Sequence, residues 1–178
     1  MKVVIGLGNP GEEYANTRHN VGRETVETIA KYFKCDSFTP DKKYAGLVTK
    51  GVLGEEKALY ILPDTFMNRS GKALSEISAK PKDLIVIHDD TDLPLGTIKI
   101  SFGKNSAGHK GVESIMRAIK SKDFWRVRVG IQKKKRVDAM KLVLSKFTPA
   151  ERLVVKKIEK KVIEALENSL QVTTISIV

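Results

Sequence analysis

The strongest constraint on the fold is the alternation of short, β-branched apolar runs with segments of helical periodicity. Six runs have the length and composition of strands, and they cover residues 2–8, 44–52, 57–63, 84–90, 97–103 and 124–132. Helical spacing of apolar residues occurs over residues 20–33, 70–79, 109–120, 138–145 and 148–169. This order predicts an α/β fold, with helices on both faces of a mixed, mostly parallel, twisted sheet.

The chain is expected to form one domain over residues 1–178, because its length suits a single core and no repeat or linker divides it. The runs 44–52 and 57–63 are joined by the short segment LGEE, which predicts an antiparallel hairpin. At the last helix, Thr148 can cap, Pro149 suits the first turn and Glu151 completes a capping box. The apolar tail 170–178 could either pack or fray.

Basic residues are concentrated in the C-terminal half. The sequence has 32 Lys and Arg against 21 Asp and Glu, a net charge of +11. Between Lys99 and Lys161 there are 19 basic and 5 acidic residues, an excess of +14, so the rest of the chain is net negative. This asymmetry favours a polyanionic partner, with nucleic acid as the first candidate. A solvated surface that only promotes solubility is the alternative.

Composition excludes several other classes of protein. Cys35 is the single cysteine, so no intramolecular disulfide can form, and three scattered histidines give no zinc-binding spacing. The N-terminus lacks the apolar core of a signal peptide, and no apolar run approaches the ~20 residues of a membrane span. We therefore expect a cytoplasmic protein without membrane association.

The segment GLGNPG at residues 6–11 matches the glycine pattern of dinucleotide-binding folds. That pattern requires a helix directly after the turn, whose N-terminus meets the pyrophosphate. Here helical periodicity begins only near Asn20, and Pro10 removes one backbone donor from the turn. The glycines therefore do not indicate a dinucleotide site.

Polar loops after several strands contain the candidate catalytic groups. His19 begins the first helix, where the helix dipole favours a neutral imidazole that can act as a base. Asp89 ends an apolar strand, and its carboxylate could hold that imidazole. Two alternatives remain: His19 is only a capping or surface residue, or the acids at 89, 90 and 92 bind a divalent metal.

Other polar and aromatic residues could bind a substrate. Asn9 and Asn68 provide neutral amides from two loops, although asparagine is also common in turns. Tyr14 and Phe66 could stack on a base or ribose, although buried packing is the commoner role of an aromatic side chain. His88 is expected to point to the opposite side of its strand from Asp89. The sequence offers no motif for a serine or cysteine nucleophile, which leaves water as the nucleophile of a hydrolase.

Several sequence blocks together resemble the signatures of bacterial-type peptidyl-tRNA hydrolases, in that family's order. They are GLGNPGEEYANTRHNVG, LPDTFMNRSGKAL, VIHDDTDLPLG, AGHKGVESI and FWRVRVGI. The resemblance implies the family's fold and hydrolysis of the ester between a peptide and the 3′-terminal ribose of tRNA, which recycles tRNA from stalled translation. It also implies peptidyl-tRNA as the partner, no metal or organic cofactor, no obligate protein partner and a monomer.

The resemblance also implies roles for individual residues. His19 would activate water, Asp89 would orient its imidazole, and Asn9 would favour blocked over free aminoacyl-tRNA. The residues that would contact the tRNA end, the adjoining peptide or a phosphate are Tyr14, Phe66, Met67, Asn68 and Arg128.

The chain departs from the family pattern at two positions. Lys110 stands where the family has an asparagine that contacts substrate, and Ser101 stands where a basic residue often contacts tRNA, a change for which Lys99 and Lys104 could compensate. A non-catalytic RNA-binding protein on the same scaffold, like the plant organellar splicing factors, is the rival hypothesis. The presence together of Asn9, His19, Asn68 and Asp89 favours the enzyme, because a protein that only binds RNA needs no base with an orienting carboxylate.

Overall fold

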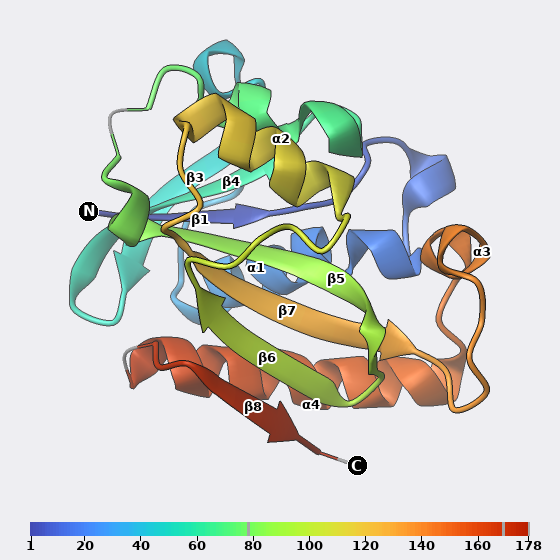
Figure 1. The fold of residues 1–178 in the computed structure, drawn as a ribbon. Coiled ribbons are helices and arrows are strands. Elements are labelled where there is room, and N and C mark those ends of the chain that lie inside the picture. The colour runs from blue at the N-terminus through green and yellow to red at the C-terminus, as the bar shows by residue number, and fades with distance from the viewer. Residues whose placement is uncertain (78, 169, 178) are drawn as a thin grey trace.

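A computed structural model describes residues 1–77, 79–168 and 170–177, and these residues form an α/β structure around one sheet (Figure 1). The strand order across the sheet is β2-β3-β4-β1-β5-β7-β6-β8. The strands are β1 (Lys2–Gly6), β2 (Thr39–Asp41), β3 (Gly46–Leu53), β4 (Glu56–Pro63), β5 (Leu84–Pro94), β6 (Thr97–Phe102), β7 (Trp125–Gln132) and β8 (Thr173–Ser176).

The sheet is mixed, as the sequence predicts, with its parallel pairs at the centre. Strands β4, β1, β5 and β7 are parallel neighbours, whereas β2, β3 and β4 on one side and β7, β6 and β8 on the other pair antiparallel. The predicted hairpin is confirmed as β3 and β4, with Leu53 paired to Glu56 beside the turn. Because the four central strands run the same way, their carboxyl ends meet at one edge of the sheet.

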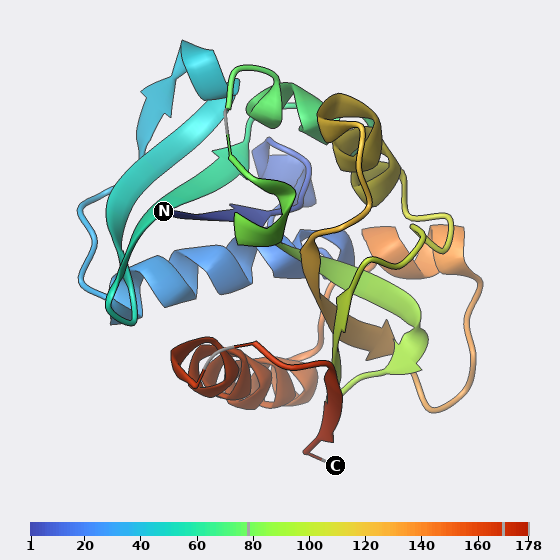
Figure 2. The ribbon, with the colours of Figure 1, turned by 60° about the vertical axis from the view of Figure 1, so that its left-hand side comes forward.

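Helices cover both faces of this sheet. The α-helices are α1 (Val21–Tyr32), α2 (Lys110–Ile119), α3 (Ala139–Leu144) and α4 (Pro149–Glu167), and the 3-10 helices are η1 (Glu12–Tyr14), η2 (Arg18–Asn20), η3 (Lys42–Tyr44), η4 (Met67–Leu74) and η5 (Pro81–Asp83). In Figure 2, α1 and α4 lie on one side of the sheet, and α2 and η4 lie on the other. The predicted capping box of α4 forms, since Thr148 and Glu151 exchange side chain to backbone hydrogen bonds.

Each face of the sheet has its own apolar core. Ile85 and Ile87 of β5 belong to the core beneath α1 and α4, whereas Leu84 and Val86 belong to the core beneath α2 and η4. Successive side chains of β5 therefore face different helical layers, as strand geometry requires. By the same alternation, successive polar residues at the end of β5 point toward different helical layers.

The structure differs from the sequence prediction in three elements. The predicted helix 70–79 is the 3-10 helix η4 and ends at Leu74, while residue 78 lies outside the described residues. Gly71 lies against α2 so closely that a Cβ there would be 2.2 Å from the Ser114 carbonyl oxygen, so η4 is held directly against α2 at this point. The sequence did not predict β2 or β8; in the tail, Ile175 of β8 pairs with Ile98 of β6.

Within the described ranges, no helix combines the length and the apolar character needed to cross a bilayer. The predicted last helix is confirmed as α4, and residues 169 and 178 of the predicted helix and tail lie outside the described residues.

Candidate active site

The start of α1 brings His19 to the carboxyl end of β5. Gly22, in the first turn of α1, packs against β5, and a Cβ there would lie 2.3 Å from the Ile87 carbonyl oxygen. Glycine is thus required for this close approach. Because His19 lies in η2, directly before α1, the same contact sets its imidazole beside the polar end of the strand.

His19 and Asp89 form a hydrogen bond with 2.8 Å between Nδ1 and Oδ1. The Asp89 side chain is 1% exposed and that of His19 is 16% exposed. A carboxylate only accepts hydrogen bonds, so Nδ1 of His19 carries the proton and Nε2 is left as the basic nitrogen. The two residues selected from the sequence are therefore in contact.

His109 is a third member of the site, and the sequence alone assigned it no role. Its Nε2 lies 2.9 Å from the same Oδ1 of Asp89. The backbone N–H of Val112 donates to its Nδ1 at 3.3 Å, so His109 caps α2 and carries its proton on Nε2. Asp89 thus accepts hydrogen bonds from the α1 layer and from the α2 layer. A histidine at a predicted helix start after a strand was the sequence signal available for this role.

Burial and charge act in opposite directions on the ionisation of this pair. Burial alone would raise the pKa of Asp89, but the two imidazoles hold that pKa well below its usual range. Burial lowers the pKa of His19, yet attraction to Asp89 and their hydrogen bond outweigh it and raise the pKa above its ordinary value. Asp89 is therefore ionised at neutral pH, and His19 is a stronger base than a free imidazole.

His88 supports the site from the other side of β5. Its Nδ1 donates to the backbone carbonyl of Asp89 at 2.7 Å, and its ring meets the ring of His109 edge-on at 4.6 Å between centroids. Burial, together with the neighbouring His109, lowers the pKa of His88 far below its ordinary value, so this ring stays neutral. These contacts give His88 a structural role beside the site.

The imidazoles open into a pocket of about 410 Å³. Its lining includes His19, Asp89 and His109, with Lys110 on the α2 side and Met140 on the α3 side. Met140 is 81% exposed and gives the pocket an apolar rim on the α3 side. A polar floor under an apolar rim suits a ligand with both a reacting carbonyl group and an apolar part.

The acids at 89, 90 and 92 do not converge, so the carboxylate metal site considered for them is not formed. Asp90 binds Arg128 at 2.6 Å and Asp92 binds Arg136 at 2.8 Å. In the part of the chain that is described, the candidate set of metal ligands is His19, Asp89 and His109, with ligand atoms within 4.8 Å of one another. The imidazole nitrogens that face Asp89 are already engaged in its hydrogen bonds.

Asn9 is held in one orientation near this site. Its Oδ1 accepts from the backbone N–H of Met67 at 2.8 Å, and its backbone exchanges two hydrogen bonds with the Asn20 side chain, next to His19. No described residue accepts from its Nδ2, which is therefore available to a ligand. Asn9 lines a separate hollow with Pro10 and Gly11, not the pocket of His19.

The two aromatic residues named as candidates for substrate binding lie in contact with each other. The rings of Tyr14 and Phe66 meet edge-on at 6.2 Å, and Phe66 is 55% exposed. Asn68 is exposed nearby on η4, whereas Met67 is buried and packs beside Gly111 of α2. Phe66 and Asn68 are thus accessible to a ligand, whereas Met67, which lies between them in the chain, is anchored against α2.

The predicted basic contacts differ in availability. Lys110 is exposed on the first turn of α2, with a 3.4 Å contact to Glu113. Arg128 is largely buried and its charge is balanced by Asp90. Ser101 is buried and pairs across the strands with the buried Arg126, so it presents no surface to a ligand.

The family profile described as "Peptidyl-tRNA hydrolase" matches residues 3–176. The chain belongs to the peptidyl-tRNA hydrolase family. It is 38% identical over 178 residues to the peptidyl-tRNA hydrolase of Aquifex aeolicus (strain VF5), which covers 97% of this chain and 92% of the relative. Identity to the peptidyl-tRNA hydrolase of Thermodesulfovibrio yellowstonii is 41% over 174 residues, covering 94% of this chain and 90% of the relative.

A solved structure of the family has the same fold. The crystal structure of peptidyl-tRNA hydrolase from Acinetobacter baumannii superposes with a TM-score of 0.83 at 29% identity, covering 94% of this chain and 89% of that chain. The family and the enzyme class expected from the sequence blocks are confirmed. The alternative of a non-catalytic RNA-binding protein finds no support in these relatives.

Proposed function

We propose that this protein hydrolyses the ester between a peptide and the 3′-terminal ribose of tRNA, with His19 as the base. The observation that carries the proposal is the 2.8 Å hydrogen bond from Nδ1 of His19 to the buried Asp89. That bond fixes the proton on Nδ1 and leaves Nε2 free in a residue that lines the pocket.

In the reaction, Nε2 of His19 takes a proton from water as the water oxygen attacks the ester carbonyl carbon. Asp89 stabilises the imidazolium that forms. The tetrahedral intermediate then collapses, the bond to the ribose oxygen breaks, and His19 returns its proton to that oxygen. The products are tRNA with a free hydroxyl and a peptide carboxylic acid, which releases its proton to solvent and leaves as the carboxylate. General-base assistance of this kind contributes about 10²- to 10⁴-fold to a rate.

The groups around the base suit a peptide ester. The free Nδ2 of Asn9 is a donor for a peptide carbonyl, and such a contact favours blocked over free aminoacyl-tRNA. Tyr14 and the exposed Phe66 offer rings for the terminal base or ribose, with Asn68 beside them. Lys110, at the pocket rim, is placed to reach a phosphate of the tRNA end, which an asparagine cannot neutralise.

A basic loop beside the pocket suits the tRNA stem. Lys133, Lys134 and Lys135 follow β7, are exposed, and have no ion-pair partner within the described residues. Gln132 closes this loop, because its Oε1 accepts from the backbone N–H groups of Lys133 and Val137. These hydrogen bonds hold the two ends of the loop, and its three lysines offer free cations to phosphates. The balanced charge of Arg128 makes it a weaker contact than these lysines.

We expect the protein to act as a cytoplasmic monomer without a cofactor, since its substrate is made in the cytoplasm and none of the proposed steps requires a metal. The decisive experiment is release of N-acetyl-amino acid from N-acetyl-aminoacyl-tRNA by purified protein in EDTA. The wild type should turn over, and His19→Ala should reduce kcat about 10³-fold.

His19→Asn is the matched variant, because its side-chain amide can still donate to Asp89 but offers no basic nitrogen. It should be as inactive as His19→Ala while melting near the wild-type temperature. If wild type and variants all bound tRNA with steep salt dependence and none turned over, the RNA-binding alternative would replace this proposal.

A further inference from the structure

Arg18, the residue before His19, is a fully buried cation. Its side chain is 0% exposed, in contrast to the usual position of arginine at the surface. Burying a guanidinium is costly unless every donor has a partner and the charge is balanced. Each of the three guanidinium nitrogens of Arg18 has a hydrogen-bond partner and Glu151 balances the charge, and these contacts reach far along the chain.

The guanidinium joins three separate elements. Nη1 donates to the Ile131 carbonyl at the end of β7 at 3.2 Å, and Nε donates to Oγ of Ser145 just after α3 at 3.0 Å. Nη2 binds Oε2 of Glu151 in the first turn of α4 at 2.6 Å. The planar fork of arginine can satisfy all three acceptors at once, which a lysine ammonium cannot do with the same geometry.

The backbone around Arg18 follows the same partners. The N–H of Arg18 donates to the Ser145 carbonyl at 2.9 Å, and Thr17 forms a β-bridge with Lys146. The Phe147 ring then covers the guanidinium, with 4.7 Å from its carbon to the ring centroid. Residues 17–18 are therefore fastened to residues 145–147 through both backbone and side chain.

The counterion of Arg18 has a second structural role. Glu151 is also the acid of the capping box at the start of α4, and it accepts from the backbone N–H of Thr148 at 2.8 Å. Burial would raise the pKa of Glu151, but its hydrogen bonds with Arg18 and Thr148 lower it. One carboxylate thus joins the start of α4 to the segment that carries His19.

We propose that Arg18 is a positioning residue for the base: by fastening η2 to the 145–151 segment, it sets the His19 imidazole at hydrogen-bond distance from Asp89. This inference rests on the proposed function for its catalytic readout. The same contacts hold the end of α3, whose Met140 and Val143 line the pocket. Arg18 therefore fixes the base and one wall of the pocket relative to each other.

The test compares Arg18→Lys and Glu151→Gln with the wild type. Arg18→Lys keeps the charge, so the electrostatic surroundings of His19, which are Asp89 of β5 and His109 before α2, stay as they were. We expect the NMR-titrated pKa of His19 to fall toward its ordinary value, because a longer contact with Asp89 stabilises the imidazolium less. We also expect kcat to fall about 10- to 100-fold, with KM changed less than about threefold.

Val162→Ala is the control for stability, because Val162 is a fully buried residue of α4 that contributes to the core away from the site. It should lower Tm while leaving the His19 titration and kcat unchanged. Glu151→Gln probes the same contact from its more exposed end and keeps the helix cap, since glutamine also serves in a capping box. The double variant should be little worse than either single variant, because both disrupt one contact.

The inference is overturned if Arg18→Lys and Glu151→Gln lower Tm as Val162→Ala does but leave the titration of His19 and kcat at wild-type values. Should Arg18→Lys not fold, Glu151→Gln decides between the same two results. The titration needs no turnover, so it separates failure of this inference from failure of the proposed function, in which the wild type itself would not hydrolyse its substrate.

Discussion

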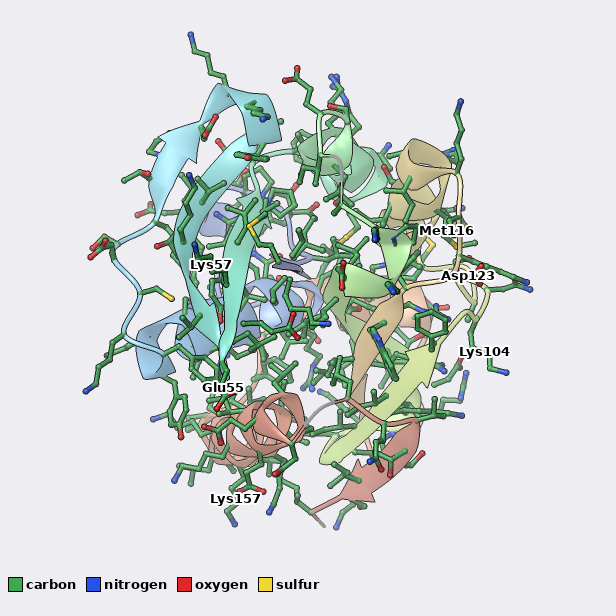
Figure 3. All side chains as sticks on the ribbon, turned by 90° about the vertical axis from the view of Figure 1, so that its left-hand side faces the viewer. Glu55, Lys57, Lys104, Met116, Asp123 and Lys157 are labelled. Atoms are coloured by element: carbon green, nitrogen blue, oxygen red, sulfur yellow. The ribbon has the colours of Figure 1, made fainter. Side chains whose placement is uncertain are left out.

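The two ends of the parallel strands both carry a hollow, but only one carries convergent chemistry. At the carboxyl end, the pocket of about 410 Å³ has Asp89 between two imidazoles. At the amino end, which faces the viewer in Figure 3, a larger pocket of about 510 Å³ lies between the β3–β4 turn and the end of α4. Its lining combines apolar side chains such as Ile85 and Trp125 with charged ones such as Lys2 and Glu56.

The difference lies in how the charges are used. At the amino end, Lys2 lies 3.4 Å from Glu56 and 3.5 Å from Asp83, so partly exposed charges balance one another in water. At the carboxyl end, a fully buried carboxylate faces two imidazoles and shifts the pKa of one of them. Pocket volume therefore does not identify the functional end of the strands, whereas buried titratable groups with specific partners do.

Replacing one aspartate at each end of the strands should give the largest difference in kcat between the two ends. Asp89→Asn removes the charge that stabilises the His19 imidazolium and no longer selects the Nδ1–H tautomer, so we expect kcat to fall about 10²-fold or more. Asp83→Asn makes the same chemical change at the amino end and should leave kcat within about twofold. Steady-state hydrolysis of N-acetyl-aminoacyl-tRNA measures both. Equal decreases in the two variants would refute the assignment of function to the carboxyl end.

The pH profile of Asp89→Asn tests in which direction Asp89 shifts the pKa of His19. His19 works as a base only when neutral, so activity falls as pH drops through its pKa. Asp89 raises that pKa. Its replacement should therefore move the acid limb of the kcat profile to lower pH, although kcat is smaller throughout. A limb that moved to higher pH would contradict the assignment.

The next largest effect is expected on the binding of tRNA, and it should differ between two basic surfaces. Replacing Lys133, Lys134 and Lys135 with serine should raise KM about tenfold and reduce the salt dependence of binding by about one unit of slope for each phosphate that these lysines neutralise, with kcat unchanged. The matched control replaces the exposed Lys156, Lys157 and Lys160 of α4, of which Lys157 is labelled in Figure 3. This equal change of charge should alter KM less than about twofold, and equal effects would indicate a nonspecific field.

The smallest effect distinguishes the two histidines that share Asp89. Serine at position 109 can still cap α2 but is too short to reach the carboxylate, so His109→Ser leaves Asp89 to interact with His19 alone. The pKa of His19 should then rise further, and the acid limb should move to higher pH by a fraction of a unit, opposite to Asp89→Asn. NMR titration of His19 measures the shift directly. No shift, or one to lower pH, would mean that His109 does not share the carboxylate.

The sequence predicted those parts of the site that follow from strand and helix ends. His19 begins a periodic helix and Asp89 ends an apolar run, so a parallel sheet had to bring them to one edge. Tyr14 and Phe66 were each named from loop position and family blocks as candidates to contact a ligand, but their contact with each other was not predicted. These residues needed only local patterns and the direction of the strands.

Other features depended on tertiary contacts that no local pattern encodes. The hydrogen bond from His109 to Asp89 forms only because α2 begins over the end of β5. The ion pair of Arg128 with Asp90 depends on the register in which β5 pairs with β7. The tail forms β8 because β6 offers an open edge, which its own composition does not reveal. The burial of Arg18 is contrary to the usual behaviour of arginine and is evident only in the folded chain.

The contact between Arg18 and Glu151 spans 133 residues, and this separation bears on how the protein is made. Synthesis proceeds from the N-terminus at roughly 5–20 residues per second, so His19 leaves the ribosome on the order of ten seconds before Glu151. Throughout that interval the growing chain is itself a peptide esterified to tRNA. A base whose position depends in part on residues near 150 is not fully held until most of its own polypeptide has been translated.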